Sequence, residues 1–265
     1  MPRLHSFIIF VALLLAASPW QARAQCTTAL VLGLDVSSSV DEDEYALQAQ
    51  GLAKAFRDPE VIDLILASPG SGIMAAAFEW SGIWQQTLVA DWAWLDSEPA
   101  ILAFADRLSG YSRDVESWPT ALGRAAEFGA NLLHRTPRDC WRYVLDISGD
   151  GVNNHGVGPD WYRRRGDFEG LIVNGLVIQG EQPDPLPYYQ QFVIHGPGAF
   201  IEIADGYEDF DRAIRRKLLR ELQPIQNVSA PGHVPTLATC CPGFDPGPRS
   251  ARKDETGSLS ETTLR

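Results

Sequence analysis

Beyond its first residues, the sequence lacks any apolar run approaching the roughly 18 residues that a transmembrane helix needs. Positive charge is also scarce: the 265 residues include 22 Lys and Arg against 34 Asp and Glu, for a net charge of −12. Such a field repels nucleic acid and anionic lipid surfaces. We therefore expect no nucleic-acid partner and no membrane insertion, and partners that are metal ions or basic protein surfaces.

Several catalytic and metal-binding motifs are missing as well. No C-x-x-C or C-x-x-H spacing occurs, which disfavours a zinc site. The absence of a glycine-rich phosphate loop and of a G-x-S-x-G turn disfavours phosphoryl transfer and serine hydrolysis. The sequence therefore favours a non-enzymatic role, with a metal-dependent hydrolase as the alternative.

Residues 1–24 are typical of a secretory signal peptide. Arg3 supplies a positive start, the apolar core over 7–16 is too short to span a bilayer, and Ala22-Arg23-Ala24 fits a cleavage site. Removing this segment, which carries two Arg and no acidic residue, lowers the net charge from −12 to −14. We expect a periplasmic or secreted protein that starts near Gln25, with an uncleaved anchor as the alternative.

The cysteines are four in number, which suits an oxidising compartment and allows three complete pairings: Cys26, Cys140, Cys240 and Cys241. Cys26 lies nine residues before Asp35, and Cys140 lies ten before Asp150. If both segments are neighbouring parallel strands, the two sulfur atoms start at the same level, which favours a Cys26–Cys140 disulfide. A bridge from Cys26 to one of the two adjacent cysteines competes with it, and those two also allow a vicinal bond.

Strand-like apolar runs alternate with helical patterns. The run over 30–34 is too continuously apolar for a half-exposed strand, so helices should cover both faces of the sheet. We predict a doubly wound α/β fold: a mostly parallel central sheet with one antiparallel edge strand, formed by a hairpin, and helices on both faces. The predicted strands cover 30–34, 72–79, 83–90, 142–148, 171–179 and 199–204, and the predicted helices cover 41–56, 59–67, 97–108, 120–133 and 209–222.

The pattern changes at 224. From there on, Pro, Gly, Ser and charged residues dominate and the periodicity vanishes, which is typical of a disordered tail. The predicted organisation is a signal peptide over 1–24, one domain over 25–223 and a tail over 224–265.

Oxygen-bearing side chains follow the first predicted strand at alternate positions: Asp35, Ser37 and Ser39. Ligands of open α/β sheets bind beyond the carboxyl ends of the strands. Two later segments should reach the same edge, with Thr120 at a helix start and Asp150 in an Asp-Gly turn after a strand. Five oxygen ligands from three loops suit a hard divalent cation, for which we expect Mg²⁺, with Mn²⁺ and Ca²⁺ as alternatives. The competing interpretation is that these residues only cap helices and turns.

This constellation resembles the metal-ion-dependent adhesion site of von Willebrand factor type A (vWA) domains. That site consists of a D-x-S-x-S turn, a Thr in a later loop and an Asp-Gly after a central strand. The order of elements from about residue 27 to 222 is similar too. Trp118 and Pro119 precede the Thr here, where the family usually has a glycine-rich loop. The matching residues are Asp35, Ser37, Ser39, Thr120 and Asp150.

The resemblance is strongest to a secreted bacterial branch of unassigned function. It implies that Ser and Thr hydroxyls bind the cation, that the Asp residues act directly or through water, and that a partner's Glu or Asp completes the coordination shell. It therefore implies a protein-binding module rather than an enzyme. A structural vWA module without bound metal is an alternative. Family members can also couple the site to movement of the last helix, here 209–222.

Three further expectations concern neighbouring residues. Asp146, four residues before the Asp-Gly turn, either accepts hydrogen bonds from the site's hydroxyls or is a buried carboxylate bonded to backbone N–H groups. Trp118 and Trp161 flank the expected site, as anchors for a partner or as packing under loops. Trp92 and Trp94 should cover the edge strand.

Overall fold

The computed structural model describes residues 25–67, 70–111 and 118–223. The expected signal peptide, the expected tail and the two adjacent cysteines lie outside these residues, so the predicted domain organisation stays a prediction. Among the described residues, we find no helix with the length and apolar character that a membrane crossing demands.

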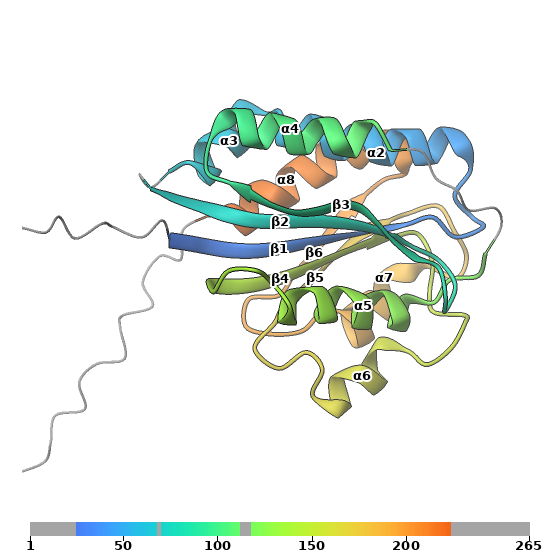
Figure 1. Cartoon of the computed structure of the whole chain (residues 1–265). Coiled ribbons are helices and arrows are strands. Elements are labelled where there is room, and N and C mark those ends of the chain that lie inside the picture. The colour runs from blue at the N-terminus through green and yellow to red at the C-terminus, as the bar shows by residue number, and fades with distance from the viewer. Residues whose placement is uncertain (1–24, 68–69, 112–117, 224–265) are drawn as a thin grey trace, which may run out of the picture. The chain divides into compact units, whose positions relative to one another are not determined.

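A six-stranded sheet forms the centre of the fold, in the spatial order β3-β2-β1-β4-β5-β6 (Figure 1). All neighbouring strands are parallel except β2 and β3, which are antiparallel. β2 is buried along its whole length and β1 along most of it, which explains their continuously apolar sequences. The strands are β1 (Gln25–Asp35), β2 (Ser71–Trp80), β3 (Gln86–Leu95), β4 (Cys140–Gly149), β5 (Ile172–Ile178) and β6 (Ile201–Ala204).

Helices cover both faces of the sheet, which confirms the predicted fold class (Figure 1). On one face lie α2 (Glu42–Phe56), α3 (Pro59–Ile65), α4 (Glu98–Ser109) and α8 (Phe210–Leu222). On the other lie α5 (Leu122–His134), α6 (Pro159–Arg165) and α7 (Pro185–Tyr188), which continues into a π-helical turn, η1 (Tyr189–Val193). A 3-10 turn, η2 (Tyr207–Asp209), leads into α8. Each helical layer therefore packs its own apolar core against the sheet.

The antiparallel edge strand differs from its prediction. We expected a strand over 83–90, but β3 starts and ends later, and Ile83 lies in the turn between β2 and β3. Trp92 and Trp94 belong to β3 itself, so the expectation that they cover the edge strand from beside it is wrong. Both pack, partly buried, against the core on the α5 side of the sheet.

A buried lysine joins the last helix to the sheet. The Nζ of Lys217 on α8 lies 2.7 Å from Asp146 Oδ1 on β4 and 2.8 Å from Glu221 Oε1, and all three side chains are at most 1% exposed. The Nδ2 of Asn174 on β5 donates to the same Glu221 oxygen at 2.7 Å. Burial raises the pKa of Asp146 to about 7, against the opposing charge of Lys217. Asp146 therefore pairs with a cation and does not bind the hydroxyls of the expected metal site.

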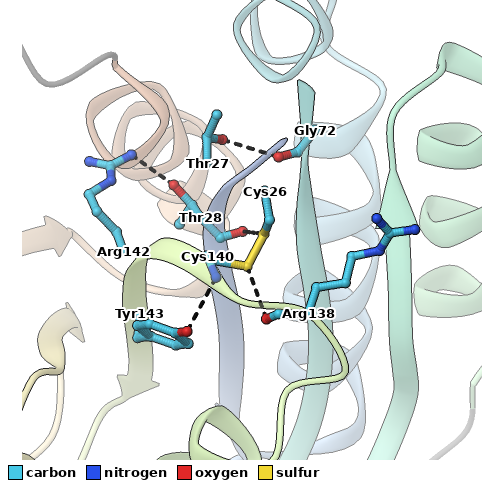
Figure 2. The surroundings of a disulfide bond; sticks show 8 residues. All are labelled: Cys26, Thr27, Thr28, Gly72, Arg138, Cys140, Arg142 and Tyr143. Atoms are coloured by element: carbon cyan, nitrogen blue, oxygen red, sulfur yellow. Dashed lines mark hydrogen bonds between the residues drawn. A yellow bond between two sulfur atoms is a disulfide. The ribbon is translucent and has the colours of Figure 1, made fainter. Parts of the chain in front are cut away.

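A disulfide joins the two central strands (Figure 2). It lies at the start of β1 and β4, whereas Asp35 and Asp150 lie at their ends. Cys26 on β1 and Cys140 on β4 are register partners, with Cα atoms 4.5 Å apart. The bond confirms the pairing that the cysteine spacing favoured.

Replacing both Cys26 and Cys140 by Ser should lower the free energy of unfolding by about 2–4 kcal/mol, because the bond closes a loop of 114 residues and restricts the unfolded chain. Urea unfolding of the oxidised protein and of the double variant measures this. The matched control replaces Cys240 and Cys241 by Ser and should change stability by less than about 0.5 kcal/mol. A large loss in the control instead would show that the tail cysteines take part in a structural bond.

Candidate metal centre

The site lies where two adjacent parallel strands end. Asp35 is the last residue of β1, and Asp150 directly follows the last residue of β4. Leu34 and Ser148 are register partners in these strands, so the two carboxylates emerge side by side at one edge of the sheet. This is the edge at which open α/β sheets bind ligands.

A chain of hydrogen bonds joins four of the five residues that the sequence singled out. The backbone N–H of Ser37 donates to Asp35 Oδ1 at 2.8 Å, which folds the turn after β1 back onto the strand end. The hydroxyls of Ser37 and Ser39 lie 3.3 Å apart, and Ser39 donates to Asp150 Oδ1 at 2.9 Å. These contacts place two carboxylates and two hydroxyls in one cluster.

Thr120 reaches the same cluster from the loop before α5. Its amide donates to Asn154 Oδ1 at 2.8 Å, and its carbonyl accepts from the Asn154 amide at 2.9 Å. A Cβ at Gly151 would lie 3.4 Å from the Thr120 hydroxyl, so that hydroxyl stands beside the Asp-Gly turn that carries Asp150. All five sequence-predicted residues are therefore neighbours in the fold.

The helix-cap interpretation of these residues is wrong. The residue that caps α2 is Asp41, whose side chain accepts from the Glu44 amide while the Glu44 side chain accepts from the Asp41 amide. At α5 the cap position belongs to Ala121, and the Gly123 amide in the first turn donates to Asn153 Oδ1 at 3.0 Å rather than to Thr120. Neither helix start uses the turn after β1 or the Thr120 hydroxyl. The turn part of the competing interpretation stands for Asp35 Oδ1, which accepts from the Ser37 amide two residues on, but it does not explain Asp35 Oδ2.

The two carboxylates are buried beside each other, and no Lys, Arg or His of the described residues forms an ion pair with either. Asp35 is 0% and Asp150 2% exposed. Burial and then the charge of Asp150 raise the pKa of Asp35 well above its usual range, and burial raises that of Asp150. Such a pair is costly unless positive charge is supplied.

One oxygen of Asp35 also lacks a hydrogen-bond partner. Asp35 Oδ2 is buried and accepts no bond from the described residues, although Oδ1 does. A buried acceptor without a donor calls for a specific explanation, such as an ion or a water molecule. The donor set of two carboxylates and three hydroxyls is the one that Mg²⁺, Mn²⁺ and Ca²⁺ prefer. The residues present therefore fit a hard divalent cation.

Three residues of the site were missed by sequence reasoning. The Tyr207 hydroxyl donates to Asp150 Oδ2 at 3.0 Å, so both oxygens of that carboxylate are held. The buried Tyr189 hydroxyl has no hydrogen-bond partner among the described residues. At Gly149, an added Cβ would lie 2.7 Å from that hydroxyl and 2.8 Å from Asp35 Oδ2, so only glycine leaves room for both.

The surroundings of the site are acidic on the α2 side. Partial burial and then the charges of Asp41, Asp150 and Glu181 raise the pKa of Glu44, the third residue of α2. The charge of Glu181 also contributes to raising the pKa of Asp150, after burial. Among the described residues, no cluster of three or more His, Cys, Asp or Glu with metal-binding geometry is found. Any cation at the site must therefore rely on the Ser and Thr hydroxyls as well as on carboxylates.

A family model described as "Protein of unknown function (DUF1194)" matches residues 25–226. No curated protein sequence matches the chain. Solved structures do match in fold, with identities too low to show more than the fold.

Proximal thread matrix protein 1 from the mussel byssus has 11% identity and a TM-score of 0.56, over 74% of this chain and 48% of its own. A second structure of that protein is described as having a zinc-occupied MIDAS motif, the metal-ion-dependent adhesion site. A von Willebrand factor type A protein from Catenulispora acidiphila has 15% identity and a TM-score of 0.54, over 75% of this chain and 43% of its own. The pilus adhesin SpaC from Lactobacillus rhamnosus GG has 11% identity and a TM-score of 0.52, over 75% of this chain and 30% of its own.

These similarities show that the chain has the vWA fold, as its sequence predicted. The chain spans less than half the length of each of these matched structures.

Proposed function

This chain belongs to the DUF1194 family, and we propose that it is a secreted module that binds another protein through a divalent cation. The cation is held by Asp35, Ser37, Ser39, Thr120 and Asp150, and an Asp or Glu of the partner completes its coordination. The observation that carries the proposal is that Asp35 Oδ2 is buried beside a second buried carboxylate and accepts no hydrogen bond from the described residues. Mg²⁺ is the expected ion, because the site offers only hard oxygen ligands.

The residues of the site prepare it for an incoming carboxylate. When bound, the cation supplies the positive charge that attracts that group. Since three of its five ligands are neutral hydroxyls, less of its charge is cancelled than at an all-carboxylate site. Ser39 and Tyr207 orient Asp150 through one oxygen each. Gln48 on α2 donates to the Asp35 carbonyl at 3.0 Å and holds the end of β1 in place.

We infer binding rather than catalysis at this site. Burial and then the charges of nearby carboxylates raise the pKa values of Tyr189 and Tyr207, so neither phenol accepts a proton near neutral pH. The hydroxyls of Ser37 and Ser39 bond to each other and to Asp150. Neither serine bonds to a histidine within the described residues, so the arrangement of a serine nucleophile with its base is not formed there.

The proposed location is the periplasm or the cell exterior. The Cys26–Cys140 disulfide is typical of proteins in oxidising compartments. The features of residues 1–24 support the same location, since they are typical of a secretory signal.

Calorimetric titration of Mg²⁺, Mn²⁺ and Ca²⁺ into metal-stripped protein lacking residues 1–24 tests the cation site. We expect saturable binding that Ser37→Ala weakens about tenfold to a hundredfold, the range seen when groups that support a metal site are removed. Ser38→Ala is the matched control, because this neighbouring hydroxyl is exposed while that of Ser37 is buried. Absence of saturable binding for all three ions, or an equal loss in both variants, would contradict the proposal and favour a structural module.

A further inference from the structure

We propose that three exposed apolar residues beside the metal centre, Trp84, Trp118 and Val157, select the partner. They favour a segment whose metal-bound Asp or Glu has an aromatic or large aliphatic residue within a few positions. The inference rests on the proposed function of the site and adds the chemistry of what docks there. We refer to these three residues as the apolar rim.

The side chains of the apolar rim are exposed at the edge of the sheet where the metal centre lies. Trp84 is 79%, Trp118 44% and Val157 43% exposed. Seven large apolar residues of the described chain are exposed, and these three lie in connections at this edge of the sheet: Trp84 between β2 and β3, Trp118 before α5, and Val157 between β4 and α6. Neighbouring exposed apolar residues mark interaction sites more often than scattered ones do.

The loops that carry the apolar rim pack on one another around the metal centre. Trp118 accepts a backbone hydrogen bond of 2.8 Å from Ser38, which lies between two of the proposed ligands. The turn that carries Trp84 is tied to the Thr120 loop, because the amide of Ala121 donates to the Ser81 carbonyl at 2.7 Å.

The third loop contacts both of the others. The His155 amide donates to the carbonyl of the proposed ligand Thr120 at 3.2 Å. A Cβ at Gly156, next to Val157, would lie 2.8 Å from the side chain of Ile83, next to Trp84. The apolar rim is therefore carried by three loops that are connected to one another beside the metal centre.

The chemistry of this border decides which partner fits. Tryptophan contributes large contact area at low entropic cost, and it is enriched among the residues that dominate binding energy. A partner residue placed on the apolar rim must stand close to the carboxylate in the metal centre, since the Trp118 loop touches the metal-binding turn. An aromatic or large aliphatic side chain next to an acidic residue in sequence satisfies this requirement.

The acidic residues near the metal centre further restrict the class of partner. The first turn of α2 contains Glu42, Asp43 and Glu44, and Glu181 lies near enough to act on Glu44 and Asp150. A segment with several acidic residues would be repelled on that side, whereas Lys or Arg would be attracted. A second copy of this chain, with its net charge of −12, fits poorly, as does an anionic lipid surface. The occupant is thus a peptide segment of another protein with one carboxylate, an apolar neighbour and basic flanks.

Selection from a random peptide library displayed on phage tests this directly. Phage are bound to protein lacking residues 1–24 in the presence of Mg²⁺ and eluted with EDTA. We expect the eluted sequences to share an Asp or Glu with an aromatic or large aliphatic residue within about three positions, together with Lys or Arg. Eluted sequences that share only the acidic residue would contradict the proposed role of the apolar rim and leave the proposed function of the metal centre standing. If EDTA elutes no enriched sequences, both are overturned.

Variants of the apolar rim provide the second test. For a selected synthetic peptide, replacing its apolar residue by Ala should weaken binding to the unaltered protein about tenfold or more. In the protein variants Trp84→Ser and Trp118→Ser, the loss of affinity that the Ala replacement in the peptide causes should be smaller than in the unaltered protein. The Mg²⁺ affinity and the melting temperature of both variants should be unchanged. Trp141→Ser is the matched control, because Trp141 is 70% exposed but lies at the start of β4, beside the disulfide and away from the metal centre. The inference would be contradicted if the Ala replacement in the peptide weakened binding to both rim variants as much as it weakens binding to the unaltered protein.

Discussion

Lys217→Met should lower the free energy of unfolding by about 3–5 kcal/mol, the cost of removing one partner from a buried charge cluster. The lysine is the cation between Asp146 and Glu221, and all three side chains are at most 1% exposed. Met fills a similar volume, so the loss comes from two buried carboxylates left without compensation rather than from a cavity. Urea unfolding at neutral pH measures the effect, and the melting temperature should fall by about 6–20 °C.

The matched control is Lys54→Met, which also removes a lysine that pairs with α8. Lys54 lies 2.5 Å from Asp211, but the two side chains are 75% and 40% exposed. Exposed pairs of this kind contribute about 0–1 kcal/mol. Adding Asp146→Asn and Glu221→Gln to Lys217→Met should recover part of the loss, because the carboxylates then carry no charge. A loss of less than 1 kcal/mol in the single variant would show that water or a proton already compensates the cluster.

The sequence predicted the alternation of strands and helices, the antiparallel edge strand and the Cys26–Cys140 disulfide, because each leaves a local or regularly spaced signal. Continuous apolar runs mark buried parallel strands, and the nearly equal spacings from Cys26 to Asp35 (nine residues) and from Cys140 to Asp150 (ten residues) reflect the register of adjacent strands. The five proposed ligands could be singled out because four of them stand at or just after strand ends and Thr120 stands at a helix start, in a recognisable order. Their proximity in the fold agrees with that pattern.

Other features left no readable signal. Lys217 and Glu221 share the buried face of α8 with Ile214 and Leu218, but charged residues in a helical pattern usually indicate the exposed face. Their partner Asp146 is more than 70 positions away, so the pairing exists only in three dimensions.

The two tyrosines of the site belong to segments with weak periodicity. Tyr189 begins a π-helical turn, and Tyr207 begins a 3-10 turn. α6, which follows Gly158 and begins at Pro159, has only seven residues, too few for an amphipathic pattern. In each case a contact distant in sequence, and not the local sequence, determines what the residue does.

Replacing Asp35 should change cation binding and the stability of the metal-free protein in opposite directions. Asp35→Asn should abolish the stabilisation that Mg²⁺ gives the protein, and it should raise the stability of the metal-free protein by about 1–2 kcal/mol, since it removes one of two buried like charges. The amide keeps an oxygen that can accept from the Ser37 N–H at the position of Oδ1. For the unaltered protein, Mg²⁺ at about 100 times its dissociation constant should contribute about 2.7 kcal/mol.

Thermal unfolding with EDTA and with Mg²⁺ separates the two effects of Asp35→Asn. In EDTA the variant should melt about 2–8 °C above the unaltered protein, and added Mg²⁺ should shift only the unaltered protein. Asp63→Asn, at an exposed position of α3, should leave both melting temperatures and the Mg²⁺ shift as they are. A destabilised Asp35→Asn that still responds to Mg²⁺ would mean that the carboxylate serves the fold and that the cation binds elsewhere. The opposite signs of the two expected effects distinguish a residue retained for binding from one retained for stability, because a purely structural carboxylate would not destabilise the metal-free fold.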